Sequence, residues 1–312
     1  MSWLDTWPID ADLQTPFDAA VVIPTIGRVH LKRALQSVYA QDFPGRIHLL
    51  IGMDKDSLLP CPEKPDNVTV QILWPGFSTS TRHGGLTPSG DGGALRTILT
   101  YLANSPYVAY LDDDNWWATN HLSTLRSAIE GVDWAYSQRW FVHPETSLPL
   151  AVDRWESCGP GRGLRTAPMG GFVDPSSLMI DKTKCRSAPQ CWTFPAVESD
   201  PMSSDCTVVG YLTQMHISRG TNEPTSFYTM NSADPFHPKR LEWIGADVYE
   251  EAGRMPDNYM AAMAARVAAY RQRKDEQAVE TNAARDTALA EAERYMAALD
   301  INLGRLLEVQ EG

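Results

Sequence analysis

The first half of the chain alternates between short, uninterrupted apolar runs and segments whose apolar residues recur every three or four positions. The runs predict buried strands, and the second pattern predicts amphipathic helices that cover them. The expected strands are Ala19–Pro24, Arg46–Ile51, Val68–Leu73 and Tyr107–Leu111, and the expected helices are Leu31–Ala40 and Gly93–Leu102. Strands that alternate with helices through short connections predict a parallel sheet with right-handed crossovers.

The second half has a weaker pattern until its last quarter. Strands are expected at Trp134–Gln138 and Ser177–Ile180, in a region rich in Gly, Pro and aromatic residues. Between residues 259 and 307, apolar residues at helical spacing predict one or two long amphipathic helices. These helices either pack back onto the parent domain or pair in a homodimer. Their apolar positions are Met260, Met263, Val267, Tyr270, Tyr295, Leu299, Leu303, Leu306 and Leu307.

Composition narrows the class of partner. Of the 312 residues, 43% are hydrophobic and 21% are charged, as in globular proteins. The formal charge of -12 argues against nucleic acid or an anionic membrane as a partner, because both need a basic surface. The chain has no run of about 18 apolar residues and no apolar core near its start that would mark a secretory signal. We therefore expect a cytoplasmic protein without a transmembrane segment.

The stretch Pro75–Gly93 is rich in Gly, Ser and Thr. A loop of this length within a compact domain is usually a functional lid or a disordered excursion. We expect a mobile lid that lies near the ligand.

The feature that says most about chemistry is the apolar run that ends at Leu111 in three carboxylates, Asp112–Asp114. Carboxylates this close repel one another, and a divalent cation relieves the repulsion. Ligands collect at the carboxyl ends of strands in open α/β sheets, which favours a cation shared with substrate phosphates. The alternative is a solvated acidic turn that also caps the next helix, for which Asn115, Thr119 and Asn120 are available.

Further segments stand in a characteristic order, namely Val21–Arg28, Leu35–Gln41, Leu50–Asp54, Gly93–Arg96 and Ser203–Leu212. Together with Asp112–Asp114, at the position of a DXD motif, they resemble the family 2 inverting glycosyltransferases of GT-A fold over residues 19–215. The resemblance implies an α/β fold with a GT-A-like mixed, mostly parallel sheet flanked by helices. It assigns residues 1–246 to the transferase domain, with a nucleotide-sugar half (about 17–118) and an acceptor half (about 119–246). Residues 247–312 form a C-terminal helical extension.

The resemblance implies metal-dependent transfer of a sugar from a nucleoside diphosphate donor, with a UDP-sugar favoured, to an acceptor hydroxyl. Mn²⁺ or Mg²⁺ would offset the charge of the departing diphosphate. Asp114 would contact the metal directly, and Asp112 would act through the ribose or a metal-bound water, with Asp113 assisting. His237 would be a further metal ligand or touch the diphosphate, or else it is a structural histidine between two prolines. Lys239 and Arg240 in the same loop would close over the phosphates.

The same resemblance assigns residues to the nucleotide. Pro24, Thr25 and Arg28 would form the turn under the nucleoside, and Asp54 would hydrogen-bond the base. Arg96 would bind a phosphate in bidentate fashion or, alternatively, form a surface salt bridge.

Inversion requires a carboxylate that removes the proton of the acceptor hydroxyl, and we expect Asp205 to be this general base. Asp205 is also suited to cap the helix that begins near Cys206. Glu198 and Asp200 are rival bases, because Ser204 stands where the family often has an acidic residue. Trp116 and Trp117 would line the sugar pocket.

Two alternatives to an active transferase stay open. A sugar-nucleotide nucleotidyltransferase normally has a glycine-rich basic loop after its first strand, whereas the turn Pro24–Arg28 holds one glycine. A non-catalytic nucleotide-sugar-binding or scaffold protein with a degenerate transferase domain would assemble through its C-terminal helices. The acceptor, whether a glycan, a lipid-linked compound or a small molecule, is not indicated by the sequence.

Overall fold

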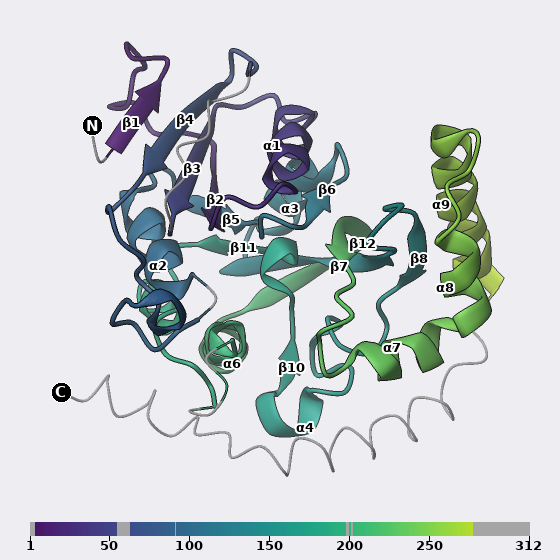
Figure 1. Ribbon diagram of the computed structural model, residues 1–312. Coiled ribbons are helices and arrows are strands. Elements are labelled where there is room, and N and C mark those ends of the chain that lie inside the picture. The colour runs from purple at the N-terminus through teal and green to yellow at the C-terminus, as the bar shows by residue number, and fades with distance from the viewer. Residues whose placement is uncertain (1–3, 55–62, 91, 198–199, 201, 277–312) are drawn as a thin grey trace.

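The computed structural model describes residues 4–54, 63–90, 92–197, 200 and 202–276 (Figure 1). Within this part of the chain, ten strands form one mixed sheet in the order β1-β4-β3-β2-β5-β11-β7-β12-β6, with β8 paired to β7. The strands are β1 Leu4–Trp7, β2 Ala19–Thr25, β3 Ile47–Met53, β4 Val68–Leu73, β5 Tyr107–Tyr110, β6 Trp116–Trp117, β7 Trp134–Val142, β8 Pro149–Val152, β11 Leu178–Asp181 and β12 Ser218–Thr229. A separate two-stranded sheet holds β9 Gly159–Pro160 and β10 Gly171–Phe172. The helices are α1 Leu31–Tyr39, α2 Gly93–Leu102, α3 His121–Ala128, α4 Thr166–Met169, α5 Ala188–Cys191, α6 Ser204–Met215, α7 His237–Ile244, α8 Ala246–Ala252 and α9 Tyr259–Glu276.

The neighbouring strands β4, β3, β2 and β5 are parallel, as the sequence predicts. Along β2, Ala20 and Val22 pack into one core with α2, α5 and α6, whereas Val21 and Ile23 pack into a second core with α1 and α3. Figure 1 shows these helices on the two faces of the sheet. Because the four strands run in the same direction, their carboxyl ends lie at one edge, where ligands bind in sheets of this kind.

The rest of the sheet mixes directions. β11 is antiparallel to both β5 and β7, and β12 is parallel to β7. The three longest ladders, β2 with β3, β3 with β4, and β7 with β12, are all parallel. The predicted class, a mixed, mostly parallel sheet flanked by helices, is confirmed.

The strand β12 is missing from the sequence prediction, although it spans twelve residues. Its first seven positions are partly or fully exposed and include Arg219, Glu223 and Pro224, so no apolar run marks it. Its ladder to β7 has irregular register on both sides of Pro224, which cannot donate a backbone hydrogen bond.

The described part of the C-terminal extension packs back onto the main domain. On α9, Met263, Val267 and Tyr270 contact a buried cluster that includes Trp116 and Trp140. Figure 1 shows α9 beside β8. This contact agrees with the first of the two interpretations for the extension, while the apolar positions 295–307 lie outside the described residues. Among the helices described, none is both long and apolar enough to cross a membrane.

Candidate active site

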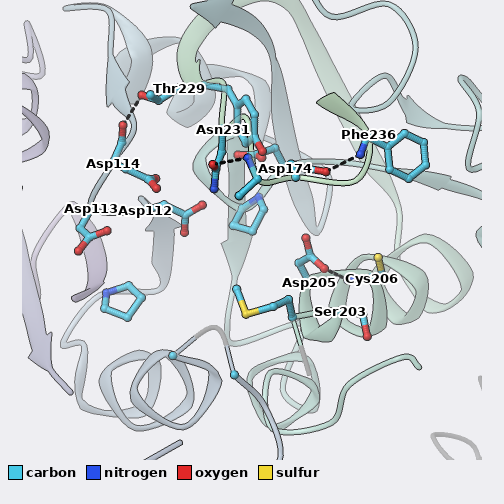
Figure 2. A pocket seen from close by; sticks show the side chains of 18 of the residues that line it. Asp112, Asp113, Asp114, Asp174, Ser203, Asp205, Cys206, Thr229, Asn231 and Phe236 are labelled. Atoms are coloured by element: carbon cyan, nitrogen blue, oxygen red, sulfur yellow. Dashed lines mark hydrogen bonds between the residues drawn. The ribbon is translucent and has the colours of Figure 1, made fainter. Parts of the chain in front are cut away.

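A cavity of about 1170 Å³ opens at the edge where the parallel strands end. One side, which we call the strand-end wall, consists of residues that end these strands, follow them or lie in the first turn of α2: Pro24, Thr25, Arg28, Asp54, Arg96 and Asp112–Asp114. A second side, the network wall, carries Arg139, Glu156, Asp174, Asp234 and Arg240. Asp205, at the start of α6, lines the same cavity. Figure 2 shows Asp112–Asp114 and Asp205 on different sides of it.

The three consecutive carboxylates of the acidic motif have different partners. Asp112 accepts a hydrogen bond from the buried Arg96. Asp113 accepts from the Thr25 hydroxyl at 2.6 Å and from Arg28 at 3.2 Å. Arg28 also donates to Asp114 Oδ2 at 2.7 Å. The structure thus brings together six of the residues that the resemblance assigns to the donor and its metal.

The arginines do not neutralise the motif fully. Burial in the cavity wall and then the Asp112 carboxylate raise the pKa of Asp114 to about 7, against the opposing effect of Arg28. The Asp114 side chain still has 36% of its surface exposed, so added charge in the cavity can reach it. Burial likewise raises the pKa of Asp113, and Arg28 opposes that shift. A cation bound at this wall would relieve the excess negative charge.

The described residues contain no group of three or more His, Cys, Asp or Glu side chains that could together hold a metal ion. A hard divalent cation needs only one or two carboxylates, however, when substrate phosphates and water complete its coordination. The carboxylates of Asp112 and Asp114 are oxygen donors of this kind, and Asp114 lies where positive charge is favourable. They fit Mn²⁺ or Mg²⁺ held jointly with a phosphate ligand, rather than a metal site built by protein alone.

Asn115 holds the acidic motif against the rest of the sheet. Its amide nitrogen donates to the Ser176 hydroxyl at 3.0 Å, and its amide oxygen accepts from the Thr229 backbone at 3.0 Å. The Ser176 hydroxyl also accepts from the backbone N–H of Asp112 at 3.2 Å. Asn115 is 1% exposed, so the backbone of the motif is fixed while its carboxylates face the cavity.

The two tryptophans after the motif do not line the cavity, and the prediction that they line a sugar pocket is wrong. Trp116 is stacked on Phe227 with ring centroids 5.2 Å apart, and the Arg33 guanidinium covers it at 3.5 Å. Trp117 is stacked on His121 at 4.2 Å and donates to the Ser176 carbonyl. Both belong to β6, whose side chains enter the cores on either side of the sheet.

Asp54 follows β3 and lines the cavity, but it is only 4% exposed. Its Oδ1 accepts from the backbone N–H and the hydroxyl of Thr79 at 2.7 and 2.6 Å, and its Oδ2 accepts from the Ser78 hydroxyl at 2.7 Å. Asp54 therefore fastens the 75–93 loop to the end of β3. Arg82 in this loop lines the cavity and contacts Met202 Sδ at 2.8 Å. The loop lies at the cavity, as expected, and its motion stays a prediction.

Asp205 stands in the first turn of α6, where its Oδ1 accepts from the Cys206 backbone at 2.6 Å. Asp205 thus accepts from one backbone N–H of the first turn, while Ser203 is the N-cap residue, and Asp205 also lines the cavity. Asp200 also lines the cavity, and its Oδ1 accepts from the Met202 backbone at 3.0 Å. The third candidate base, Glu198, lies outside the described residues.

Apart from Arg240, which is expected to close over the phosphates, the network wall is absent from the sequence prediction. Arg139 on β7 donates to Asp153 at 2.8 Å, to Asp174 at 2.6 Å and to Glu156 at 3.3 Å. Arg240 on α7 pairs with both oxygens of Glu156 at 2.6 and 3.0 Å. These partners lie up to 84 residues apart in the chain. The one signal in the sequence is Arg139 inside a strand of apolar and aromatic residues, because a buried charge needs a partner.

His237 is not among the described residues that line the cavity, which favours the alternative of a structural histidine, and its role as a metal ligand stays a prediction. It begins α7, and its ring packs edge-on against Tyr249 with centroids 5.8 Å apart. The first turn of the helix directs this side chain toward α8, whereas Arg240, three residues later, lines the cavity. Lys239, expected to close over the phosphates, pairs with Glu242 at 2.8 Å.

Comparison with protein-family models gives no match for this chain, and comparison with curated proteins gives none either. Among solved structures, S. aureus TarS 1-349 in complex with UDP is similar at a TM-score of 0.49 and 13% identity, covering 91% of this chain and 72% of that chain. The complex of TarS 1-349 with UDP-GlcNAc gives 0.48 and 11%, covering 88% and 79%. The longer TarS structure gives 0.48 and 13%, and the match covers 88% of this chain but only 48% of that one. At these values, no residue role and no substrate can be assigned to this chain from TarS. Membership of family 2 stays a prediction.

Proposed function

We propose that this protein is a metal-dependent inverting glycosyltransferase that moves a sugar from a nucleoside diphosphate to an acceptor hydroxyl. The observation that carries the proposal is the placement of Asp112–Asp114 and Asp205 around one cavity at the carboxyl edge of the parallel strands. Such an edge is where nucleotides bind in α/β sheets. The cavity also exceeds the range of about 300–1,000 Å³ that is usual for small-molecule sites, so it has room for donor and acceptor together.

The strand-end wall suits the donor. Thr25 ends β2 and Arg28 belongs to the turn after it, so both lie beside the acidic motif and would lie under the nucleoside diphosphate. Asp112 and Asp114 would hold a divalent cation, which offsets the negative charge that grows on the leaving diphosphate. Arg96 and Arg28 now pair with these carboxylates, and each guanidinium would turn part of its donor set to phosphate oxygens.

Asp205 supports the acceptor side of the reaction. Its carboxylate would take the proton of the acceptor hydroxyl while that oxygen forms a bond to the anomeric carbon. The bond between the anomeric carbon and the phosphate oxygen breaks, and its electron pair leaves with the diphosphate. Attack from the face opposite the leaving group inverts the anomeric configuration. A base across the cavity from the diphosphate-binding wall meets this requirement.

Nucleotide binding and turnover can be tested separately. Thermal-shift measurements with UDP, GDP and CDP, each with and without Mn²⁺, should show stabilisation by at least one diphosphate that depends on the metal. Asp114→Ala should abolish that stabilisation. Asp205→Asn should retain the metal-dependent stabilisation. It should lower the rate of donor hydrolysis, measured as the release of free sugar, by about 10²–10⁴-fold.

Asp66→Asn is the matched control, because Asp66 is an exposed acid that does not line the cavity. It should leave both readouts at the wild-type level. Absence of stabilisation by every diphosphate, with Mn²⁺ present, would overturn the proposal. Metal-dependent binding without turnover of any UDP-, GDP- or CDP-sugar would instead indicate the non-catalytic alternative.

A further inference from the structure

The arginines of the network wall are already occupied by carboxylates of the protein. Arg139 donates to three acids, and Arg240 pairs with Glu156 and with Asp234, the latter at 2.7 Å. Both arginines are at most 4% exposed. A buried guanidinium that leaves such partners for a ligand would leave their charges uncompensated, which costs several kcal/mol. These two side chains are therefore poor receptors for an anionic group.

The third arginine on this side, Arg165, is engaged as well. It donates to Cys206 Sγ at 2.7 Å, its guanidinium lies 4.4 Å from the centre of the Phe172 ring, and Asp205 and Glu156 lie within electrostatic reach. The positive end of α6, which would otherwise attract an anion, carries Asp205 in its first turn. The described residues that line the whole cavity include nine carboxylates and six arginines, so an anionic acceptor would meet net repulsion.

The groups still presented to a ligand on this side are largely uncharged. Residues 229–236, which connect β12 to α7, all line the cavity, and Asn231, Ser232, Ala233 and Pro235 are exposed. Figure 2 shows the Asn231 side chain between Asp114 and Asp174, where its amide oxygen accepts from the Ala233 backbone at 2.9 Å. An amide and a hydroxyl bind other hydroxyl groups well. Phe172, in contrast, is only 3% exposed and lies against the Arg165 guanidinium, so amide and hydroxyl groups are what this segment offers to a ligand.

We propose that the acceptor is an uncharged, hydroxyl-rich compound such as a neutral glycoside, bound between residues 231–236 and Asp205. This inference rests on the proposed transferase function and adds the class of acceptor. The arginines that already pair with carboxylates of the protein disfavour a phosphorylated or carboxylated acceptor, and the amide of Asn231 and the hydroxyl of Ser232 suit a neutral one.

The test compares three probes that differ mainly in charge: 4-nitrophenyl β-glucoside, its glucuronide and its 2-amino-2-deoxy counterpart. Titration calorimetry with saturating Mn²⁺ and UDP measures the affinity for each. We expect the neutral glucoside to bind at least tenfold more tightly than the glucuronide, because juxtaposed like charges in a binding site are costly. Equal affinities, a preference for the glucuronide or the amine, or no measurable binding of any probe would overturn the inference.

A charge placed in the 231–236 segment sharpens this test. Ser232→Lys should raise the affinity for the glucuronide at least fivefold relative to the glucoside. Ser127→Lys makes the same charge change at an exposed serine of α3 that does not line the cavity, and it should leave the ratio unchanged. An unchanged ratio in Ser232→Lys would place the acceptor away from this segment and contradict the inference.

The Mn²⁺–UDP thermal shift, measured in parallel on the same samples, separates the two proposals. If that shift is absent, the proposed transferase function is contradicted, whatever the affinities of the three probes. If it is present and the probes show no preference for the neutral compound, the acceptor inference alone fails.

Discussion

The strand-end wall and the network wall both hold arginine–carboxylate pairs, but the network wall buries both of its arginines, whereas the strand-end wall has one buried arginine, Arg96, and one exposed arginine, Arg28. In the strand-end wall, Arg28 is 45% exposed and Asp114 is 36% exposed. In the network wall, Arg139 is 3% exposed and its partner Asp153 is 0% exposed. Exposed pairs contribute little to stability and can exchange partners, whereas a buried pair cannot lose one member without a large cost. The first wall can therefore adapt to a ligand, and the second acts as scaffold.

The largest expected effect comes from breaking the scaffold. Arg139→Met keeps a side chain of similar length but leaves Asp153, Asp174 and Glu156 without their shared cation. We expect a loss of about 3–5 kcal/mol in the free energy of unfolding, measured by urea denaturation. A loss below ~1 kcal/mol would mean that the network wall does not stabilise the fold and would remove the contrast between the walls.

The second-largest effect concerns the pH dependence of stability, which depends on a buried neutral histidine in the strands that support the strand-end wall. His48 on β3 is 1% exposed, accepts from the Asn104 backbone at 3.2 Å and donates to Gln71 at 2.8 Å. Burial lowers its pKa to about 4, from an ordinary value of 6.5. Between these values the unfolded chain binds a proton that the folded chain does not, so stability falls as the pH drops.

For His48, the loss between pH 7 and pH 5 should be on the order of 2 kcal/mol. His48→Gln lacks the titrating imidazole, so its free energy of unfolding should fall less over that interval. His121, whose pKa burial lowers to about 3, still titrates in the variant, so part of the slope remains. Urea denaturation at pH 7, 6 and 5 gives both slopes, and identical slopes for the two proteins would contradict the assignment.

The two walls also differ in how much the sequence reveals. The strands β2, β3, β4 and β5 are buried on both faces and therefore read as nearly continuous apolar runs. The abrupt change from Leu111 to Asp112 locates the edge where the cavity opens. These local signals predict the placement of Thr25, Arg28 and the acidic motif because each lies at the end of a strand or within a few residues of it.

The network wall has no such signal. Arg139, Glu156 and Arg240 come from β7, a loop and α7, so their meeting depends on strand pairing that no single segment encodes. The strand β12, which carries residues 229–236 to the cavity, is half-exposed and lacks an apolar run. The prediction for Trp116 was wrong for a related reason. Its position after the acidic motif suggests that its side chain lines the cavity, but the side chains of a strand point into the layers on either side of the sheet.

A smaller effect is expected where the two walls are connected. Asn115→Ala removes the bonds that join the motif to Ser176 and to the Thr229 backbone. Leaving these buried groups without partners should cost about 1–3 kcal/mol of stability. The carboxylates would also lose their fixed spacing, so the affinity for Mn²⁺ with UDP should fall severalfold by calorimetry. Retained affinity despite reduced stability would show that Asn115 supports the fold without positioning the motif.

The smallest effect on stability is expected at Arg28, and it makes the contrast between the walls quantitative. Arg28→Gln removes two pairs, at 3.2 and 2.7 Å, but the arginine is nearly half exposed, so the free energy of unfolding should change by less than ~1 kcal/mol. Binding of Mn²⁺ with UDP should nevertheless weaken at least fivefold, because Arg28 would share the diphosphate charge. Arg126→Gln is the matched control: it breaks an exposed pair with Glu130 away from the cavity and should leave that affinity unchanged. A stability loss as large as that of Arg139→Met would show that the strand-end wall is scaffold too, and its pairs would then not be available to a ligand.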